Sequence, residues 1–401
     1  MKIKQPKKDE NILARFAANN GVTRRQFMER AAATGLTIAA ASTIWSETAS
    51  AAQKSGGHMV VGVGAGETGD TLDIGTTGGA HNITMIQTLR SKLVDPKTSG
   101  GLEPGLATEW NASDQGKRWT FKLRQGVEFH NGKTLSTQDV IDSLNLHRGE
   151  DSKSGGASML KVVSDIKADG GDVVIELSEP AADFPYYLAQ NMFTIGPSND
   201  GTVDQSGVGT GPFALEEFDP GVRGAGKRNA NYFKDGKPYV DSFELISAKD
   251  PTALTNGLMT GVFHAIQPVD PKIASRLDAE PGVSVVSVAG GSTITMPMHA
   301  DKAPFDNLDF RLAMKYSVDR TELRDKVFQG HASLANDHPV APFDQFFNAD
   351  IPQRNYDPDK AMFHLKKSGH ENTNVQIHAS DAAFAGSVDA GVLYGASAKK
   401  A

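Results

Sequence analysis

Three glycine-rich stretches have spacings that could surround a phosphate group with backbone amides, the chemistry of nucleotide binding. Residues 64–69 read G-x-G-x-x-G, but residues 70–75 are a poor start for the helix whose N-terminus would hold a pyrophosphate. Residues 221–227 have P-loop spacing, but Arg228 replaces the Ser or Thr that would bind magnesium. Residues 126–134 end in Gly-Lys-Thr, with one residue too many between the glycines. We therefore interpret residues 64–69 as a loop and predict no nucleotide cofactor.

The side chains that most often carry catalysis or bind metals are scattered along the chain. The eleven histidines include no H-E-x-x-H motif and no tight cluster, so we interpret His130, His264 and His299 as ordinary polar or core residues. No G-x-S-x-G elbow is present, and the sequence does not show whether any two carboxylates face each other as in a glycosidase. The chain has no cysteine, which excludes disulfides, thiol nucleophiles and cysteine metal sites. We predict no catalytic set and no cofactor.

The composition limits the class of protein. The chain has a formal net charge of −7, and residues 1–51 hold eight Lys or Arg against four Asp or Glu, so the remainder carries −11. An acidic chain without a basic stripe argues against nucleic acid as a partner, and charge alone would not hold it on an anionic membrane. The roughly 350 remaining residues are too many for one hydrophobic core, so we expect two or more lobes.

The segment from Trp119 to Leu144 predicts a definite order of elements. Its first five residues alternate apolar and polar side chains, which is typical of a half-buried strand. Gly126 and the Asn131-Gly132 pair are turn residues, because Asn and Gly accept positive φ most readily. Ser136 with Asp139 predicts a capping box at the start of a helix whose apolar residues follow at once.

This order of strand, turns and capped helix resembles the signature block of the family 5 extracellular solute-binding proteins. Residues 208–213 resemble the family's Gly-Thr-Gly-Pro turn, and residues 228–233 its Arg-Asn-x-x-Tyr-Trp stretch, with Phe in place of Trp. Residues 304–320 and 357–369 resemble two later helical motifs of the family. His264 replaces an Asp of the family, which puts the local capping role of that Asp in doubt. The resemblance runs from about Gly57 to the last residue.

The resemblance implies a two-lobed α/β fold of the periplasmic-binding-protein type. We expect lobe I at residues 52–290, with an extra subdomain at about 95–205, and lobe II at residues 291–401. Because family members continue further, we expect lobe II to be incomplete. The implied function is capture of a peptide or similar small solute by hinge closure, followed by delivery to the permease subunits of an ABC importer in the inner membrane. We expect a monomer.

The resemblance also implies where the ligand binds. In the family the cleft is lined partly by the loop after the first strand and partly by chain near the crossover between the lobes. Carried onto this sequence, these are Thr77, Gly78, Gly79 and Ala80, and Thr295, Met296, Pro297 and Met298. A glycine-rich loop lets a ligand approach the backbone, and methionines form an adaptable apolar wall. The alternative interpretation is a plain surface loop for the first group and a buried strand for the second.

The N-terminal residues resemble an export signal of the twin-arginine type. The motif contains Arg24, Arg25 and Phe27, a short Ala-rich apolar segment follows, and an A-x-A cleavage site ends at Ala51. The apolar segment is shorter than the roughly 20 residues that span a membrane. We therefore expect residues 1–51 to be a signal peptide. With no lipobox cysteine, we expect a soluble periplasmic protein without a lipid anchor.

Two other classes of protein compete with this interpretation. An exported enzyme, a hydrolase or an oxidoreductase, is the main alternative, and the twin-arginine motif is its only positive evidence. A structural or chaperone-like exported protein would need neither hinge nor cleft. The scattered catalytic side chains favour the binding protein, and we predict no enzymatic activity.

Overall fold

The computed structural model describes residues 55–64, 66–76, 78–97, 101–150, 152–288, 290–342, 344, 346–380 and 383–401. The chain divides into two compact units, unit 1 ending at Gln267 and unit 2 running from Pro268 to Ala401, and each is described by itself. The expected signal peptide lies outside the described residues. The lobe boundaries at 52–290 and 291–401 stay a prediction.

The main sheet of unit 1 has five strands in the order β12-β13-β14-β1-β15. Strand β1 runs parallel to both of its neighbours, whereas β12, β13 and β14 are antiparallel neighbours. The apolar run at residues 59–63 forms most of β1. The strands are β1 (His58–Val63), β12 (Phe213–Asp219), β13 (Arg223–Arg228), β14 (Ser242–Ser247) and β15 (Ala265–Gln267).

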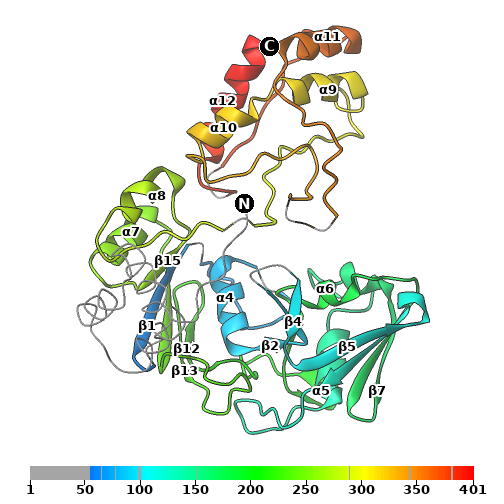
Figure 1. The fold of residues 1–401 in the computed structure, drawn as a ribbon, viewed down its shortest axis with the longest axis vertical. Helices are drawn as coiled ribbons and strands as arrows, with labels where there is room; N and C mark the ends of the chain where they lie inside the picture. The colour runs from blue at the N-terminus through cyan, green and yellow to red at the C-terminus, as the bar shows by residue number, and fades with distance from the viewer. Residues whose placement is uncertain are drawn as a thin grey trace, which may run out of the picture. The chain divides into compact units, whose positions relative to one another are not determined.

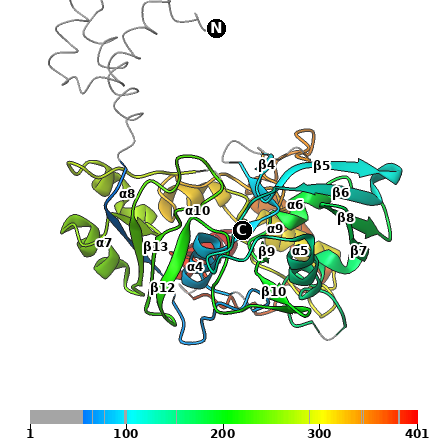
Figure 2. The ribbon, with the colours of Figure 1, turned by 90° about the horizontal axis from the view of Figure 1, so that it is seen from below.

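Two helices cover opposite faces of this sheet, α4 (Ala80–Leu89) and α7 (Pro251–Met259) (Figures 1 and 2). Successive residues of a strand point to opposite faces, and β1 shows this directly. Val63 lies in one core cluster with residues of α4, whereas a side chain at Gly62 would meet Leu254 of α7 at 2.8 Å. The α4 cluster consists of Val63, Leu72, Ile74, Met85, Ile86, Leu89, Val203, Phe213, Phe243 and Leu245.

A four-stranded antiparallel sheet forms a second core in unit 1, inside the subdomain expected at about 95–205. Its order is β5-β6-β8-β7, with β5 (Ala107–Ser113), β6 (Arg118–Leu123), β7 (Val163–Asp169) and β8 (Asp172–Leu177). The predicted alternation is confirmed, since Trp119, Phe121 and Leu123 are buried. They pack with apolar residues of α5 (Thr137–Asn145) and α6 (Phe184–Leu188).

Short two-stranded sheets and 3₁₀ turns complete the described part of unit 1. Three two-stranded sheets pair β2 (Ser91–Lys92) with β9 (Thr194–Ile195), β3 (Val94–Pro96) with β4 (Leu102–Pro104), and β10 (Ser198–Asn199) with β11 (Thr202–Val203). Two 3₁₀ turns are η1 (Asp114–Gly116) and η2 (Met159–Val162).

Unit 2 is built from helices joined by long irregular segments. They are α8 (Pro271–Asp278), α9 (Leu308–Tyr316), α10 (Arg320–Lys326), α11 (Pro358–Ser368) and α12 (Ser387–Lys400). Helices α9 and α11 lie side by side (Figure 1), where the ring of His364 stacks on Tyr316 and bonds Asp309 at 2.8 Å. Within the described ranges of both units, no helix is long and apolar enough to cross a membrane.

Helix α11 lies within residues 357–369, one of the helical motifs noted in the sequence, and local residues set both of its ends. The Asp357 side chain accepts a hydrogen bond from the backbone N–H of Lys360 at 2.9 Å, and Pro358 is the first helical residue. Gly369 ends the helix with a φ of 74°, the left-handed conformation that glycine adopts without steric cost.

Candidate ligand-binding site

The first predicted group of ligand residues lies where the loop after β1 meets α4. Gly78 is exposed, and a side chain there would meet no atom within 4 Å. Gly79 is the N-cap of α4 and Ala80 its first residue; no side chain caps the helix, and its first turn contains no acidic residue. Because the first N–H groups of a helix have no partner within it, this end suits an acceptor oxygen of a ligand. Thr77 lies outside the described residues.

A buried pair fixes this loop to α4. Nδ1 of His81, which is fully buried, lies 3.0 Å from Oδ2 of Asp70, and the same carboxylate oxygen accepts the backbone N–H of Glu67 at 3.3 Å. The His81 ring also stacks on Phe218, with ring centroids 6.1 Å apart. These contacts hold the start of α4 against both the loop and the sheet.

The second predicted group lies in unit 2, in a stretch without helix or strand. Thr295 and Pro297 are exposed, whereas Met296 and Met298 are half-buried. Close by, the Thr293 hydroxyl donates to the carbonyl oxygen of Pro339 at 3.3 Å. The alternative of a buried strand is therefore wrong in this unit. The two groups belong to different units, and a shared role in ligand binding stays a prediction.

The two glycine motifs that resemble phosphate loops pack against each other. A side chain at Gly66 would come 2.5 Å from the carbonyl oxygen of Gly221, and one at Gly221 would come 2.4 Å from the backbone of Glu67. The N–H of Gly66 donates to the Ser247 hydroxyl at 2.9 Å. The described part of residues 64–76 contains no helix, so the loop interpretation is confirmed. These glycines allow two turns to approach closely.

The family-like motifs meet at a junction around the turn at residues 209–212. Nδ1 of His130 lies 3.3 Å from the backbone nitrogen of Gly209, which donates to it. Nε2 of the same ring lies 3.1 Å from the carbonyl oxygen of Gly211. Asn229 donates to the same carbonyl oxygen at 3.0 Å. A side chain at Gly211 would come 2.4 Å from the carbonyl carbon of Leu89, at the end of α4. The motifs therefore join helix, sheet and subdomain.

The capping box predicted at α5 is confirmed and belongs to a larger network. The Asp139 carboxylate accepts hydrogen bonds from the backbone N–H of Ser136 at 2.9 Å and of Ser198 at 2.7 Å, and it pairs with Lys133. Burial by itself raises the pKa of Asp139, but the bonds from Lys133, Ser198 and Ser136 outweigh it and lower the pKa below its usual value. The signature block thus ties α5 to the strand that contains Ser198.

His264 also has a structural role that the sequence did not reveal. Its Nδ1 accepts the backbone N–H of Val60 at 2.9 Å, and its own backbone N–H donates to the carbonyl oxygen of Val60 at 2.8 Å. The side chain that replaces the family's Asp therefore extends the pairing between β1 and the start of β15.

Two buried cations escaped the sequence analysis, because a single basic residue after a helix carries no signal of burial. Arg90 donates to the carbonyl oxygen of Asp204 at 2.5 Å, and Lys92 donates to that of Ala189 at 3.0 Å. Burial lowers the pKa of Arg90 to about 10, although the negative charge of Asp204 raises it in part. Burial also lowers the pKa of Lys92, although the negative charge of Asp95 opposes this. Both side chains attach loops to the strand after α4.

Comparison with known proteins identifies the class. Residues 101–397 match the model of the bacterial extracellular solute-binding proteins, family 5 Middle. Heme-binding protein A of Haemophilus influenzae is 26% identical over 325 residues, 74% of this chain and 59% of that protein. The dipeptide-binding protein of Escherichia coli is 26% identical over 326 residues, 74% of this chain and 60% of that protein. The nickel-binding periplasmic protein of Escherichia coli is 26% identical over 292 residues, 69% of this chain and 55% of that protein.

Solved structures show the fold. The binding protein AgaA of A. tumefaciens R10 in complex with agropinic acid has a TM-score of 0.72 at 24% identity, covering 86% of this chain and 71% of that one. DppA of Helicobacter pylori in complex with the peptide STSA has a TM-score of 0.67 at 23% identity, covering 81% of this chain and 68% of that one. The predicted α/β periplasmic-binding-protein fold is confirmed.

The fold and the family match together define an extracellular solute-binding protein. The chain belongs to family 5 of the bacterial extracellular solute-binding proteins. It spans 55% to 60% of the length of the three curated relatives named above.

Proposed function

We propose that this protein is a periplasmic receptor that captures a peptide or a similar small solute and delivers it to an ABC importer. The observation that carries the proposal is the family match over residues 101–397. The dipeptide-binding and nickel-binding proteins among its relatives support a ligand of the peptide or small-complex class. The proposed partners are the permease subunits in the inner membrane, and the proposed form of the receptor is a soluble monomer.

In this proposal the ligand contacts both predicted groups of residues, Thr77, Gly78, Gly79 and Ala80, and Thr295, Met296, Pro297 and Met298. The exposed glycine and the uncapped start of α4 support an acceptor group of the ligand at the first group. The half-buried methionines support an apolar contact at the second. Closure of the lobes around the ligand would exclude water and give the permease a distinct state to recognise.

We propose that the protein breaks no bond and is not an enzyme. The family match supports this, because the family is defined by solute binding. The exported-enzyme alternative is tested in the same experiment as the receptor, since turnover of a solute would be seen as its chemical conversion.

The experiment is thermal unfolding of residues 52–401 with di- and tripeptides, nickel complexes and sugars. A ligand that binds only the native state stabilises it by mass action, by about 2.7 kcal/mol at a hundredfold excess over Kd. We expect one solute class to raise the melting temperature and to be recovered unchanged. A cooperative melt that no solute shifts would contradict the receptor function, and conversion of the solute would establish the enzyme instead.

A further inference from the structure

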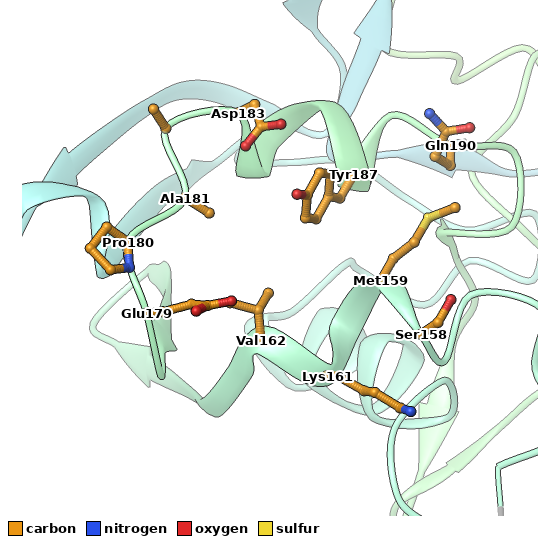
Figure 3. Close-up of a pocket in the computed structure, with 11 residues that line it drawn as sticks. Ser158, Met159, Lys161, Val162, Glu179, Pro180, Ala181, Asp183, Tyr187 and Gln190 are labelled. Atoms are coloured by element: carbon orange, nitrogen blue, oxygen red, sulfur yellow. The ribbon is translucent and has the colours of Figure 1, made fainter. Parts of the chain in front are cut away.

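A hollow of about 670 Å³ lies in the four-stranded subdomain of unit 1 and includes none of the predicted ligand residues. One wall is η2 with Ser158, and the other is the segment from Glu179 to Gln190, which contains α6 (Figure 3). Its volume falls within the range of roughly 300–1,000 Å³ that small-molecule sites occupy.

The two walls of the hollow are held together before any ligand arrives. The backbone N–H and the hydroxyl of Ser178 both donate to the carbonyl oxygen of Val162, at 2.8 and 3.1 Å. The indole N–H of Trp119 donates to the carbonyl oxygen of Ala181 at 3.2 Å. Leu160 and Phe184, behind the two walls, are buried in the core. A ligand would therefore meet a preorganised site, which lowers the entropy cost of binding.

The acidic and basic side chains that line the hollow point in different directions. Figure 3 shows the side chains of Glu179 and Tyr187 extending into the hollow and the Asp183 carboxylate on its rim, whereas the amino group of Lys161 points away. Within the described part of the chain, the side chains of Glu179 and Asp183 have no hydrogen bond or ion pair. The carboxylates of Glu179 and Asp183 are thus left unpaired in the described structure, although the Lys161 side chain also lines the hollow.

Apolar surface lies beside these carboxylates. Met159, Val162 and Pro180 line the hollow, and the Tyr187 ring packs edge-on against Phe184 with centroids 5.9 Å apart. The face of an aromatic ring attracts a cation, and the aliphatic side chains suit the carbon skeleton of a ligand.

We propose that this hollow binds a protonated primary amine carried on an aromatic or aliphatic body. The ammonium N–H groups donate to the Glu179 and Asp183 carboxylates, and the body packs on Tyr187, Met159 and Val162. An anionic solute meets two like charges here, and a quaternary ammonium has no N–H to donate. The site is separate from the groups proposed to bind the transported solute.

The test is a ligand-observed NMR titration of the full chain with phenethylamine and with its neutral analogue 2-phenylethanol. We expect phenethylamine to bind with a Kd on the order of 1 mM, as suits a small ligand in an open hollow, and at least about tenfold more tightly than the alcohol. Equal binding of the two compounds, or no binding of the amine, would overturn the proposal.

Two variants locate the site. The double variant Glu179→Gln with Asp183→Asn should weaken phenethylamine binding at least about tenfold, because it removes both charge-assisted bonds. The matched control is Glu109→Gln, an exposed carboxylate on β5 of the same subdomain, which should leave the Kd within about twofold. An unchanged Kd in the double variant would place the amine elsewhere and refute this site. The solute-induced shift in melting temperature should persist in the double variant, so the two sites are distinguished.

Discussion

His130 acts as donor and acceptor at the junction of the family-like motifs, which makes its protonation state important for stability. Nδ1 can accept the N–H of Gly209 only when the ring is neutral. Burial lowers the pKa of His130 below 6.5, although the bond to the Gly211 carbonyl oxygen opposes this. The unfolded chain therefore takes up the proton first as the pH falls. This contribution to stability is present above about pH 6.5 and is lost progressively below it.

The measurement is urea unfolding of wild type and His130→Gln between about pH 7.5 and about pH 5. Wild type should lose stability over this interval, and the variant should be less stable at high pH and lose less on acidification. Burial also lowers the pKa of His147, to about 4, so some loss from that ring remains in both proteins. Identical slopes in the two proteins would exclude His130 as the responsible group.

Gly211 has no room for a side chain, which predicts a large effect from a single methyl group. A Cβ would lie 2.4 Å from the carbonyl carbon of Leu89, and backbone atoms cannot move aside cheaply. We expect Gly211→Ala to lower the free energy of unfolding by about 1–3 kcal/mol. The control is Gly155→Ala in the same unit, where a Cβ meets no atom within 4 Å and the change should be within about 0.5 kcal/mol. Equal stability of both variants, measured by urea unfolding, would contradict the close packing.

At the scale of the elements, the attachment of α5 depends on an ionised Asp139. Asp139→Asn keeps the N-cap geometry but removes the charge that pairs with Lys133, so we expect a loss of about 2–3 kcal/mol. The lowered pKa of Asp139 predicts that wild type keeps this contribution above about pH 4 and loses it as the pH falls further.

The matched control is Asp250→Asn at the start of α7, a cap whose side chain accepts the N–H of Thr252 and has no further partner among the described residues. Asn caps a helix as well as Asp does, so the change in stability should be within about 0.5 kcal/mol. Urea unfolding at neutral pH compares the two variants. If Asp139→Asn were as mild as the control, the carboxylate would be a simple cap without the wider network.

Helix α12 shows where periodicity misleads. Apolar residues four apart, at 384, 388, 392 and 396, predict a helix, and α12 is present from Ser387. Val388 and Val392 are nevertheless exposed, and the buried side includes Tyr394 and Ser397. The Tyr394 hydroxyl donates to the carbonyl oxygen of Met314 at 2.8 Å. The Ser397 hydroxyl donates to the carbonyl oxygen of Ser317, also at 2.8 Å. In unit 2, partners for polar side chains decide which face packs.

At the scale of the whole molecule, the receptor proposal predicts a change in dimensions. If the solute identified by thermal unfolding closes the lobes, small-angle scattering should give a smaller radius of gyration at saturation than without it. A solute from the same panel that does not shift the melting temperature is the control and should leave the scattering unchanged. Equal scattering with and without the bound solute would argue against hinge closure.

Elements that depend on residues a few positions apart could be predicted well. The alternation at Trp119–Leu123, the Ser136–Asp139 box and a helix within residues 357–369 all appear as expected. Their hydrogen bonds and burial patterns involve near neighbours, so the chain specifies them locally. The family-like motifs also lie close together in the sequence, and the family match confirms the family that they indicate.

The sequence by itself thus determined the family, the fold class and many local elements. Only the tertiary structure decided what the motif residues do. His130 contacts Gly211, 81 residues away, and the Ser247 hydroxyl accepts the N–H of Gly66 from 181 residues away. The hollow joins residues 158–162 to residues 179–190. The physical reason is that these hydrogen bonds, buried groups and cavities form between segments far apart in the sequence. The tertiary fold decides which of those segments come into contact, and local residue types and spacing do not show this.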